Sequence, residues 1–291
     1  MKPVPSPWAP GKLPDTRGVR VPERTLPLLR DLVQMHTGMF YSDDRLMFLQ
    51  ERLSALAVEH GFDSLLDYYY LLKYDAVAGG EWARVIDALS VQETYFHREW
   101  DQVVALAETI VPQLIAMRRL RIRIWSVPCA TGEEPLSIAM ALAETGAFDR
   151  VPIEIHASDA SGAALERAAA RRYSGRAFRT LPDSLRQKYF SPEGDGAWRV
   201  NDDLFRRVTS WTRVNLARPA EALPLSHCDV IFCRNLFIYF TEAGIRQVID
   251  GFADRMPSPG YLCVGACESL LRLTARFDLQ DVGGAYVYVK P

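Results

Sequence analysis

The stretch WSVPCATGEEP, residues 125–135, lies between a strand-like run, RIRIW, and a helix-like run, LSIAMALAE. A strand, a tight loop and a helix in this order build many nucleotide sites, because the loop leads into the electropositive start of the helix. A dinucleotide site requires the glycine spacing G-x-G-x-x-G. This loop has one glycine, Gly132, a proline at position 128, and two acids, Glu133 and Glu134, at the helix start. These acids repel a pyrophosphate, so the loop favours a cationic or hydroxyl-rich ligand.

Outward from this loop, strand-like and helix-like runs alternate from residue 121 to the C-terminus. Such alternation predicts an α/β domain with a mainly parallel sheet and helices on both faces. Further strand-like runs are IEIHASD, DVIFCRN, YLCVGAC and AYVYVK. Residues 186–216 interrupt the alternation with short β-rich runs around a Gly/Pro turn. This interval predicts a small antiparallel β-subdomain inserted in the sheet domain, which spans residues 121–291.

The chain before the sheet domain divides into three parts. Residues 1–24 are expected to be a proline-rich tail, since the first 27 residues carry seven prolines, each of which removes a backbone donor. Residues 25–90 place leucines at three- to four-residue spacing, which predicts a helical N-terminal domain. Residues 91–120 are expected to form a linker and a helix.

The composition excludes several classes of protein. Of the 291 residues, 48% are hydrophobic and 24% are charged, as in ordinary globular proteins. A net charge of -2 argues against a general nucleic-acid binder. No apolar run reaches membrane-spanning length and the N-terminus does not resemble a signal peptide, so we expect a cytoplasmic protein without membrane insertion. The five cysteines include no CxxC pair, which indicates reduced thiols and no metal site.

Polar residues follow three of the predicted strands, at the edge where doubly wound sheets bind their ligands. Asp159 ends the second strand, where an acid typically accepts hydrogen bonds from both ribose hydroxyls. Alternatively, Ser158-Asp159-Ala160-Ser161 caps the following helix, and the residues alone leave both readings open. Together with the first loop, Asp159 favours a nucleoside without pyrophosphate. S-adenosylmethionine fits this description, because it combines a sulfonium, an amino acid, a ribose and an adenine.

Four motifs resemble one family. WSVPCATGEEPLSIAM resembles the WSAGCSTGEEPYSIAM-type loop of the CheR family of chemoreceptor glutamate methyltransferases, and IFCRNLFIYF is similar to its IFCRNVMIYF signature. LSVQETYFHRE is similar to the family's LTxNETYFFRE linker, and GACESL to its GHSESL. The resemblance implies a class I S-adenosylmethionine-dependent methyltransferase, with a Rossmann-like sheet whose last strand is antiparallel, an inserted β-subdomain and an all-α N-terminal domain.

The resemblance also implies an activity. It is the S-adenosylmethionine-dependent esterification of glutamate side chains on the cytoplasmic domain of a methyl-accepting chemotaxis-type receptor, with S-adenosylhomocysteine as the second product. The enzyme would be a protein-glutamate O-methyltransferase, and we expect it to be a monomer. An exposed glutamate is already ionised at pH 7, so this reaction requires alignment rather than a general base.

Site residues follow from the resemblance by position. It implies two catalytic residues that flank the transferred methyl group, Arg98 and Tyr239. It implies cofactor contacts from the linker, the strand ends and the segments lining the adenine and the sulfonium: Gln92, Thr94, Arg98, Glu134, Asp159, Asn215, Leu216, Asn235 and Leu236. Glu134 is expected near the methionine moiety and Asp159 at the ribose. Two alternatives remain open, a linker salt bridge for Arg98 and a core aromatic for Tyr239.

The sequence departs from the family pattern at several positions. Gln92 replaces an asparagine, His97 a phenylalanine and Pro128 a glycine, while Ala266 and Cys267 replace His and Ser. Proline cannot adopt a positive φ, so the loop is reshaped if position 128 requires one. These departures raise an alternative function. The chain would then be a catalytically weak CheR-like signalling module that binds the cofactor or partner proteins for regulation.

Two further features concern the receptor. Only SPEGDGAW separates Tyr189-Phe190 from Arg199-Val200, whereas family members that dock on a receptor's C-terminal pentapeptide have a longer loop there. We therefore expect methylation without this tether. Basic residues on the first helices and before the first strand either steer a glutamate-rich receptor helix or form a solvated surface: Arg45, Arg52, Arg118, Arg119, Arg121 and Arg123.

Overall fold

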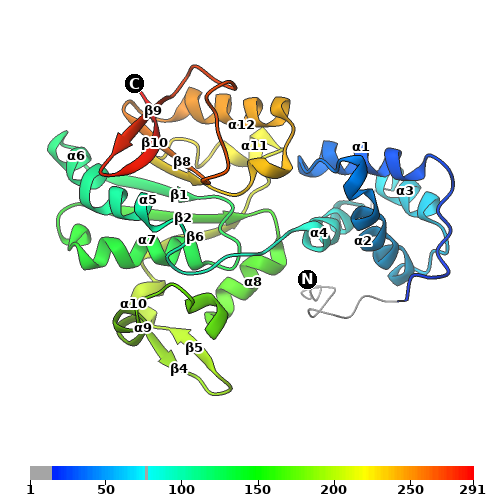
Figure 1. Cartoon of the computed structure of the whole chain (residues 1–291), viewed down its shortest axis with the longest axis horizontal. Helices are drawn as coiled ribbons and strands as arrows, with labels where there is room; N and C mark the ends of the chain where they lie inside the picture. The colour runs from blue at the N-terminus through cyan, green and yellow to red at the C-terminus, as the bar shows by residue number, and fades with distance from the viewer. Residues whose placement is uncertain (1–14, 76–77) are drawn as a thin grey trace.

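The computed structural model describes residues 15–75 and 78–291, so the N-terminal tail predicted from the prolines is described only from residue 15 onward. A helical N-terminal domain lies at one end of an α/β domain (Figure 1). Within the described part of the chain, none of the helices combines the length and the apolar character needed to cross a membrane. The described residues also contain no cluster of His, Cys, Asp and Glu side chains arranged to hold a metal ion.

The N-terminal domain is all helical, as the leucine spacing predicts. Its elements are α1 (Thr25–Thr37), the 3₁₀ turn η1 (Asp43–Arg45), α2 (Leu46–Glu59), α3 (Leu65–Tyr74) and α4 (Ala78–Leu89). Leucines at helical spacing, such as Leu49, Leu53 and Leu56 on α2, are fully buried in its core. Gly38 and Gly61 follow α1 and α2 with positive φ, which is the backbone conformation that ends a helix most easily.

A linker joins the two domains. Residues 90–99 form no regular helix or strand and lead into α5 (Trp100–Ala105). The helix continues through the π-helical turn η2 (Leu106–Ile110) into α6 (Val111–Ala116). Val103 and Leu106 pack against the main sheet, so this helix anchors the linker to the α/β domain.

The main sheet has seven strands in the order β6-β2-β1-β7-β8-β10-β9. The strands are β1 (Ile122–Ser126), β2 (Ile153–Asp159), β6 (Val208–Arg213), β7 (Val230–Cys233), β8 (Gly260–Val264), β9 (Asp278–Val282) and β10 (Ala285–Lys290). The first five in the order are parallel, whereas β10 is antiparallel to both β8 and β9, which confirms the expected antiparallel last strand. Because β2 and β7 flank β1 on opposite sides, the strand order reverses at β1.

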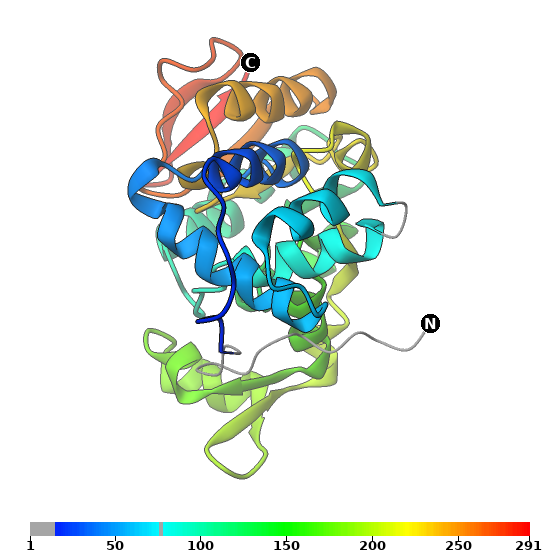
Figure 2. The same ribbon diagram turned by 90° about the vertical axis from the view of Figure 1, so that its right-hand side faces the viewer.

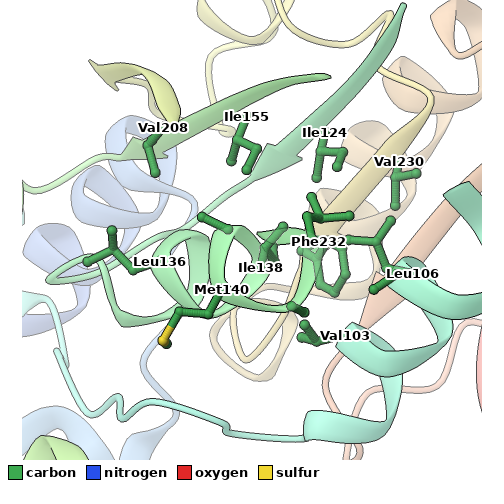
Figure 3. Packing of buried hydrophobic residues seen from close by; sticks show 14 of the residues in the cluster. Val103, Leu106, Ile124, Leu136, Ile138, Met140, Ile155, Val208, Val230 and Phe232 are labelled. Carbon is green, nitrogen blue, oxygen red and sulfur yellow. The ribbon is translucent and has the colours of Figure 1, made fainter. Parts of the chain in front are cut away.

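Helices cover both faces of this sheet, and the alternation of side chains along β1 shows why. Ile124 faces the side that α7 (Glu133–Glu144) covers, together with Phe232 and Leu106 (Figure 3). The next residue, Trp125, faces the opposite side and packs its ring 5.7 Å from that of Phe252 on α12 (Glu242–Arg255). Successive strand residues therefore enter two different cores. The remaining helical elements around the main sheet are η3 (Ala147–Asp149), α8 (Gly162–Ala170), α11 (Pro219–Ala222) and η5 (Phe237–Tyr239).

The inserted subdomain differs in extent from the predicted interval. Its antiparallel sheet has the order β3-β5-β4 and projects away from the main sheet (Figures 1 and 2). The elements are β3 (Arg172–Ser174), η4 (Gly175–Phe178), α9 (Asp183–Tyr189), β4 (Phe190–Pro192), β5 (Ala197–Val200) and α10 (Asp202–Phe205). The predicted range 186–216 is wrong at both ends, because β3 pairs with β5 from upstream while β6 pairs in parallel with β2. A β-rich run does not itself indicate its partner strand, and β3 is too short to be recognised.

Candidate functional site

A pocket opens where β1, β2 and β7 end, between the two domains. The α/β domain contributes six of the residues that the sequence predicted as the site, the linker contributes Gln92, and the helical domain closes the pocket from the other side. The lining residues are Thr37, Met39, Ile86, Leu89, Ser90, Val91, Gln92, Val127, Pro128, Ala130, Asp159, Ala160, Val214, Asn215, Leu216, Asn235, Leu236, Tyr239 and Phe240. Three predicted site residues do not line it: Thr94, Arg98 and Glu134.

The loop after β1 forms one wall of this pocket. Its Val127–Pro128 peptide bond is cis, and the positive φ angles of the loop fall at Ala130 (45°) and Gly132 (99°). Pro128 itself has no positive φ, as a proline requires, and the two positive φ angles fall on other residues of the loop. Gly132 is closely packed, since a Cβ there would lie 3.0 Å from the ring of Trp211.

Asp159 lies at the end of β2 beside this loop and is 7% exposed. Its Oδ2 accepts the backbone N–H of Ala130 at 2.8 Å, and its Oδ1 accepts that of Ser161 at 2.8 Å. Burial raises the pKa of Asp159 to about 6, although these hydrogen bonds oppose the shift. The N-cap of α8 is Ser161, whose hydroxyl accepts from the backbone of Ala164, so the segment 158–161 does cap this helix, through Ser161, while Asp159 accepts the backbone N–H of Ser161 itself.

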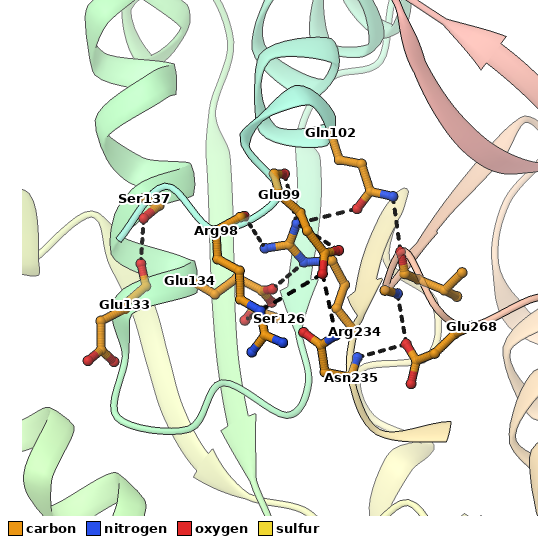
Figure 4. Close-up of polar contacts among 12 residues, drawn as sticks. Arg98, Glu99, Gln102, Ser126, Glu133, Glu134, Ser137, Arg234, Asn235 and Glu268 are labelled. Carbon is orange, nitrogen blue, oxygen red and sulfur yellow. Dashed lines mark hydrogen bonds and ion pairs between the residues drawn. The ribbon is translucent and has the colours of Figure 1, made fainter. Parts of the chain in front are cut away.

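Glu134 does not line the pocket, and in Figure 4 its side chain points toward Ser126 and Arg234. Its carboxylate accepts a hydrogen bond from Ser126 Oγ at 2.7 Å and pairs with Arg234 Nε at 2.7 Å. The side chain of Arg234 is only 3% exposed and also donates to the backbone carbonyls of Arg98 and Glu99, at 2.9 and 3.0 Å. Arg234 thus ties the linker to the start of α7.

Sequence reasoning did not assign a role to Arg234. The available signal was a lone charged residue at the end of the apolar strand VIFC. Burial alone would lower the pKa of Arg234, but Glu134 and Glu99 raise it above its ordinary value. The guanidinium is therefore a permanently charged and fully partnered part of the scaffold.

Of the linker residues predicted for the site, Gln92 lines the pocket and Arg98 does not. Gln92 lines it, with its side chain held between Ser161 Oγ at 3.0 Å and Arg167 at 2.7 Å. Arg98 donates to the carbonyl of Glu93 at 2.8 Å and lies 3.8 Å from a carboxylate oxygen of Glu99. Both contacts are with other residues of the linker, and neither partner is a buried side chain.

His97, the neighbour of Arg98, stacks on Trp100 with 3.5 Å between ring centroids. Burial lowers the pKa of His97 to about 4, so this side chain is neutral at physiological pH. The stacked geometry matches the packing role of the aromatic residue that the family has at this position.

The segment from Asn235 to Phe240 also lines the pocket. Asn235 has a positive φ of 60°, and Tyr239 is half-buried at the pocket. Burial raises the pKa of Tyr239 and the charge of Glu268 adds to this, while the positive charges of Arg45 and Arg98 act in the opposite direction.

Asn215 joins the two domains directly. Its Nδ2 donates to the carbonyl of His36, at the end of α1, at 2.8 Å, and its Oδ1 accepts from Ala217 N at 3.0 Å. Asp87 on α4 makes a second contact, because it accepts from Ser161 Oγ at 2.7 Å. The helical domain is therefore fastened to both sides of the pocket.

The chemistry of the lining fits S-adenosylmethionine. Among the described residues that line the pocket, none is lysine, arginine or histidine, so the pocket has no side-chain cation for a phosphate. Asp159 offers a carboxylate to hydroxyl donors, while apolar side chains such as Leu216 and Leu236 suit a flat ring. The sulfonium and the amino group require no anion-binding group, which agrees with this lining.

Comparison with known families agrees with the geometry. Residues 92–283 match the family described as "CheR methyltransferase, SAM binding domain", and residues 24–90 match "CheR methyltransferase, all-alpha domain". The chain belongs to the CheR methyltransferase family. As a CheR protein it is an S-adenosylmethionine-dependent methyltransferase, with the all-α and Rossmann-like domains that its sequence indicated.

Relatives of this CheR protein are similar along nearly their whole length. Chemotaxis protein methyltransferase 2 of Vibrio cholerae is 37% identical over 90% of this chain and 91% of its own. Chemotaxis protein methyltransferase 1 of Pseudomonas aeruginosa is 29% identical over 90% of this chain and 96% of its own. The chemotaxis protein methyltransferase of Escherichia coli is 29% identical over 87% and 86%, respectively.

Proposed function

We propose that this CheR methyltransferase esterifies glutamate side chains on the cytoplasmic domain of a methyl-accepting chemotaxis-type receptor. The observation that carries the proposal is the similarity of the whole two-domain chain to chemotaxis protein methyltransferases, together with a pocket at which Tyr239 is half-buried and whose described lining carries no cationic side chain. The positive charges of Arg45 and Arg98 would favour a carboxylate that approaches Tyr239, against the negative charge of Glu268 behind the pocket wall.

The residues of the chain have simple tasks in such a reaction. S-adenosylmethionine supplies an electrophilic methyl group, and the products are a glutamate methyl ester and S-adenosylhomocysteine. Asp159 would accept hydrogen bonds from the ribose hydroxyls, while Asn215, Leu216, Asn235 and Leu236 would hold the adenosine. A glutamate carboxylate is ionised at pH 7, so no general base is required.

Alignment of the carboxylate falls to the residues at the edge of the pocket. Arg98 would orient the incoming carboxylate, and Tyr239 would position its reacting oxygen beside the methyl group. Glu134 would act indirectly, because its carboxylate is engaged by Ser126 and Arg234 beneath the loop. Thr94 would contribute through the linker rather than from the pocket lining.

The arginines that could steer a receptor helix lie at two places, on the helices of the N-terminal domain and before β1, and the first group is better placed for this role. Arg118, Arg119, Arg121 and Arg123 lie at the amino end of β1, whereas the pocket lies at its carboxyl end. Arg121 and Arg123 also pair with Glu154, at 2.8 and 2.9 Å. Arg45 and Arg52, on η1 and α2, are therefore the better candidates for steering a glutamate-rich helix.

The β4–β5 connection supports methylation without a pentapeptide tether. The turn consists of residues 193–196, of which Gly194, Asp195 and Gly196 all have positive φ. Such a tight turn offers no extended segment beyond the two strands. Titration with a receptor C-terminal pentapeptide is expected to show no tight binding, and binding at low micromolar concentration would exclude the idea.

Two measurements test the function in sequence. Calorimetry should detect binding of S-adenosylmethionine and S-adenosylhomocysteine, and radiolabelled methyl groups should then transfer to a receptor cytoplasmic fragment as a base-labile ester. Cofactor binding without any transfer would favour the alternative, a catalytically weak signalling module. Base-stable label would show that a group other than a carboxylate accepts the methyl group.

A further inference from the structure

Glu268 contacts the wall of the pocket from behind. This residue follows β8, is 8% exposed and does not line the pocket. One carboxylate oxygen, Oε2, accepts the backbone N–H groups of Asn235 and Gly265, both at 2.7 Å. The other, Oε1, accepts those of Phe237 at 2.6 Å and Ile238 at 3.3 Å. Figure 4 shows Glu268 directed at the backbone of Asn235.

We propose that Glu268 is a positioning residue of the methyltransferase, whose carboxylate sets the backbone of residues 235–239 in the shape that the cofactor pocket requires. It acts through Asn235, Leu236 and Tyr239, which do line the pocket. The proposal rests on the pocket as the cofactor site and is independent of the group that accepts the methyl.

The backbone of this segment explains why an acid is required. After β7 the chain reverses at Asn235, with a φ of 60°, and enters η5, which has only three residues. Such a short turn leaves its first N–H groups without acceptors within the helix, and buried donors without partners are costly. A carboxylate offers two acceptor oxygens and no donor, so it alone matches four N–H groups.

Close packing around Gly265 restricts the arrangement further. A Cβ at this glycine would lie 2.6 Å from Asn235 Nδ2 and 2.8 Å from Glu268 Oε2. The Glu268 carboxylate and the Asn235 side chain therefore occupy the space that any larger residue would need. The contact leaves little freedom for an alternative position of the Asn235 backbone.

The substitution Glu268→Gln tests the proposal with minimal change in shape. Whichever way the amide is turned, its NH₂ group opposes two backbone donors, so one half of the contact is lost. Hydrogen–deuterium exchange of the full chain without ligand should become about 10- to 100-fold faster at residues 235–238, the range for losing a hydrogen bond to a charged group. The affinity for S-adenosylhomocysteine should fall by a similar factor.

Asp229→Asn provides the matched control. Asp229 stands at the amino end of β7, the strand that leads to Asn235, is 6% exposed, and accepts the backbone N–H of Arg123 at 2.9 Å. Its substitution should change neither the exchange at 235–238 nor cofactor affinity. If the two substitutions changed the exchange at residues 235–238 and the cofactor affinity equally, Glu268 would contribute only to overall stability, and the proposal would be overturned.

Glu268→Asp covers the case in which Glu268→Gln does not fold. This variant keeps the charge but shortens the side chain, so exchange and affinity should lie between those of the wild type and the amide variant. Unchanged exchange at residues 235–238 in either folded variant would contradict the proposal. Neither readout requires a methyl acceptor, so an incorrect receptor assignment would leave both results intact.

Discussion

Phe40 donates its backbone N–H to the carbonyl of Tyr239 at 2.8 Å, and Met39 forms a β-bridge with Phe240. The helical domain is thereby hydrogen-bonded to the backbone of the residue that we place beside the transferred methyl group. The two domains therefore form one site, since neither provides all of its walls.

Gly38→Ala should disturb this contact. Gly38 has a φ of 77°, and a Cβ there would lie 2.5 Å from the ring of Phe240. We expect a destabilisation of about 1–2 kcal/mol from the backbone and about 1–3 kcal/mol more from the clash. Methyl transfer should fall together with stability, as measured by urea unfolding and a transfer assay.

Gly61→Ala is the control for Gly38→Ala. Its φ is 78°, but nothing lies within 4 Å of the added Cβ, so only the backbone cost of about 1–2 kcal/mol should appear. Phe240→Leu should partly restore the Gly38→Ala variant. Equal losses at the two glycines would mean that the contact with Phe240 has no role in joining the domains.

Cofactor affinity should depend on pH through Asp159. Its pKa is about 6 in the absence of ligand, and ribose hydroxyls donate to the ionised form. The affinity for S-adenosylhomocysteine should therefore fall as the pH is lowered through 6, whereas Asp159→Asn should bind more weakly and lose this dependence. Glu133→Gln, which removes a buried acid outside the pocket, should retain it, and a pH-independent wild type would argue against a ribose contact.

The raised pKa of Asp159 makes the stability of the ligand-free protein fall with rising pH, whereas cofactor affinity should rise. A pKa raised from 3.8 to about 6 means that the folded state binds more protons in this window. The contribution of Asp159 is fully present below pH 3.8 and is lost as the pH rises through 6. Urea unfolding should show Asp159→Asn gaining stability relative to the wild type as the pH rises from 3.8 through about 6.

Arg98→Ala should reduce methyl transfer by about 100-fold or more, the effect of misplacing a reacting group by about 1 Å. S-adenosylhomocysteine binding should change much less, because Arg98 does not line the pocket. Arg179→Ala is the control, since Arg179 lies over the same Tyr95 ring, at 3.5 Å, and pairs with Glu93. Equal rates for the Arg98→Ala variant and the wild type would remove Arg98 from the catalytic set.

Arg234→Met should destabilise the fold by about 3–5 kcal/mol, because it leaves the Glu134 carboxylate buried without its partner. Adding Glu134→Gln should recover part of this loss. Urea unfolding of the single and double variants gives the coupling energy between the two residues. Additive effects would show that the ion pair does not connect the linker to α7.

Local patterns in the sequence were sufficient for much of the fold. The runs around residues 122 and 153 alternate apolar with polar residues, the run around residue 230 is apolar, and the helices between them have a period of three to four, so each element is recognisable from its own residues. The acids after Gly132 and the acid that ends β2 were sufficient to disfavour pyrophosphate. That inference agrees with a pocket whose described lining contains no cationic side chain.

The tertiary structure decided what depends on residues far apart in the chain. It assigned β6 to the main sheet, because a strand's partner is not encoded in the strand itself. The tertiary structure also showed that Glu134 does not line the pocket, because its carboxylate pairs with Arg234, one hundred residues later in the chain. The acids of WSVPCATGEEP thus indicated by themselves which ligands the loop disfavours, whereas packing decided that neither Glu133 nor Glu134 lines the pocket, since hydrogen-bond partners are chosen only when the chain is folded.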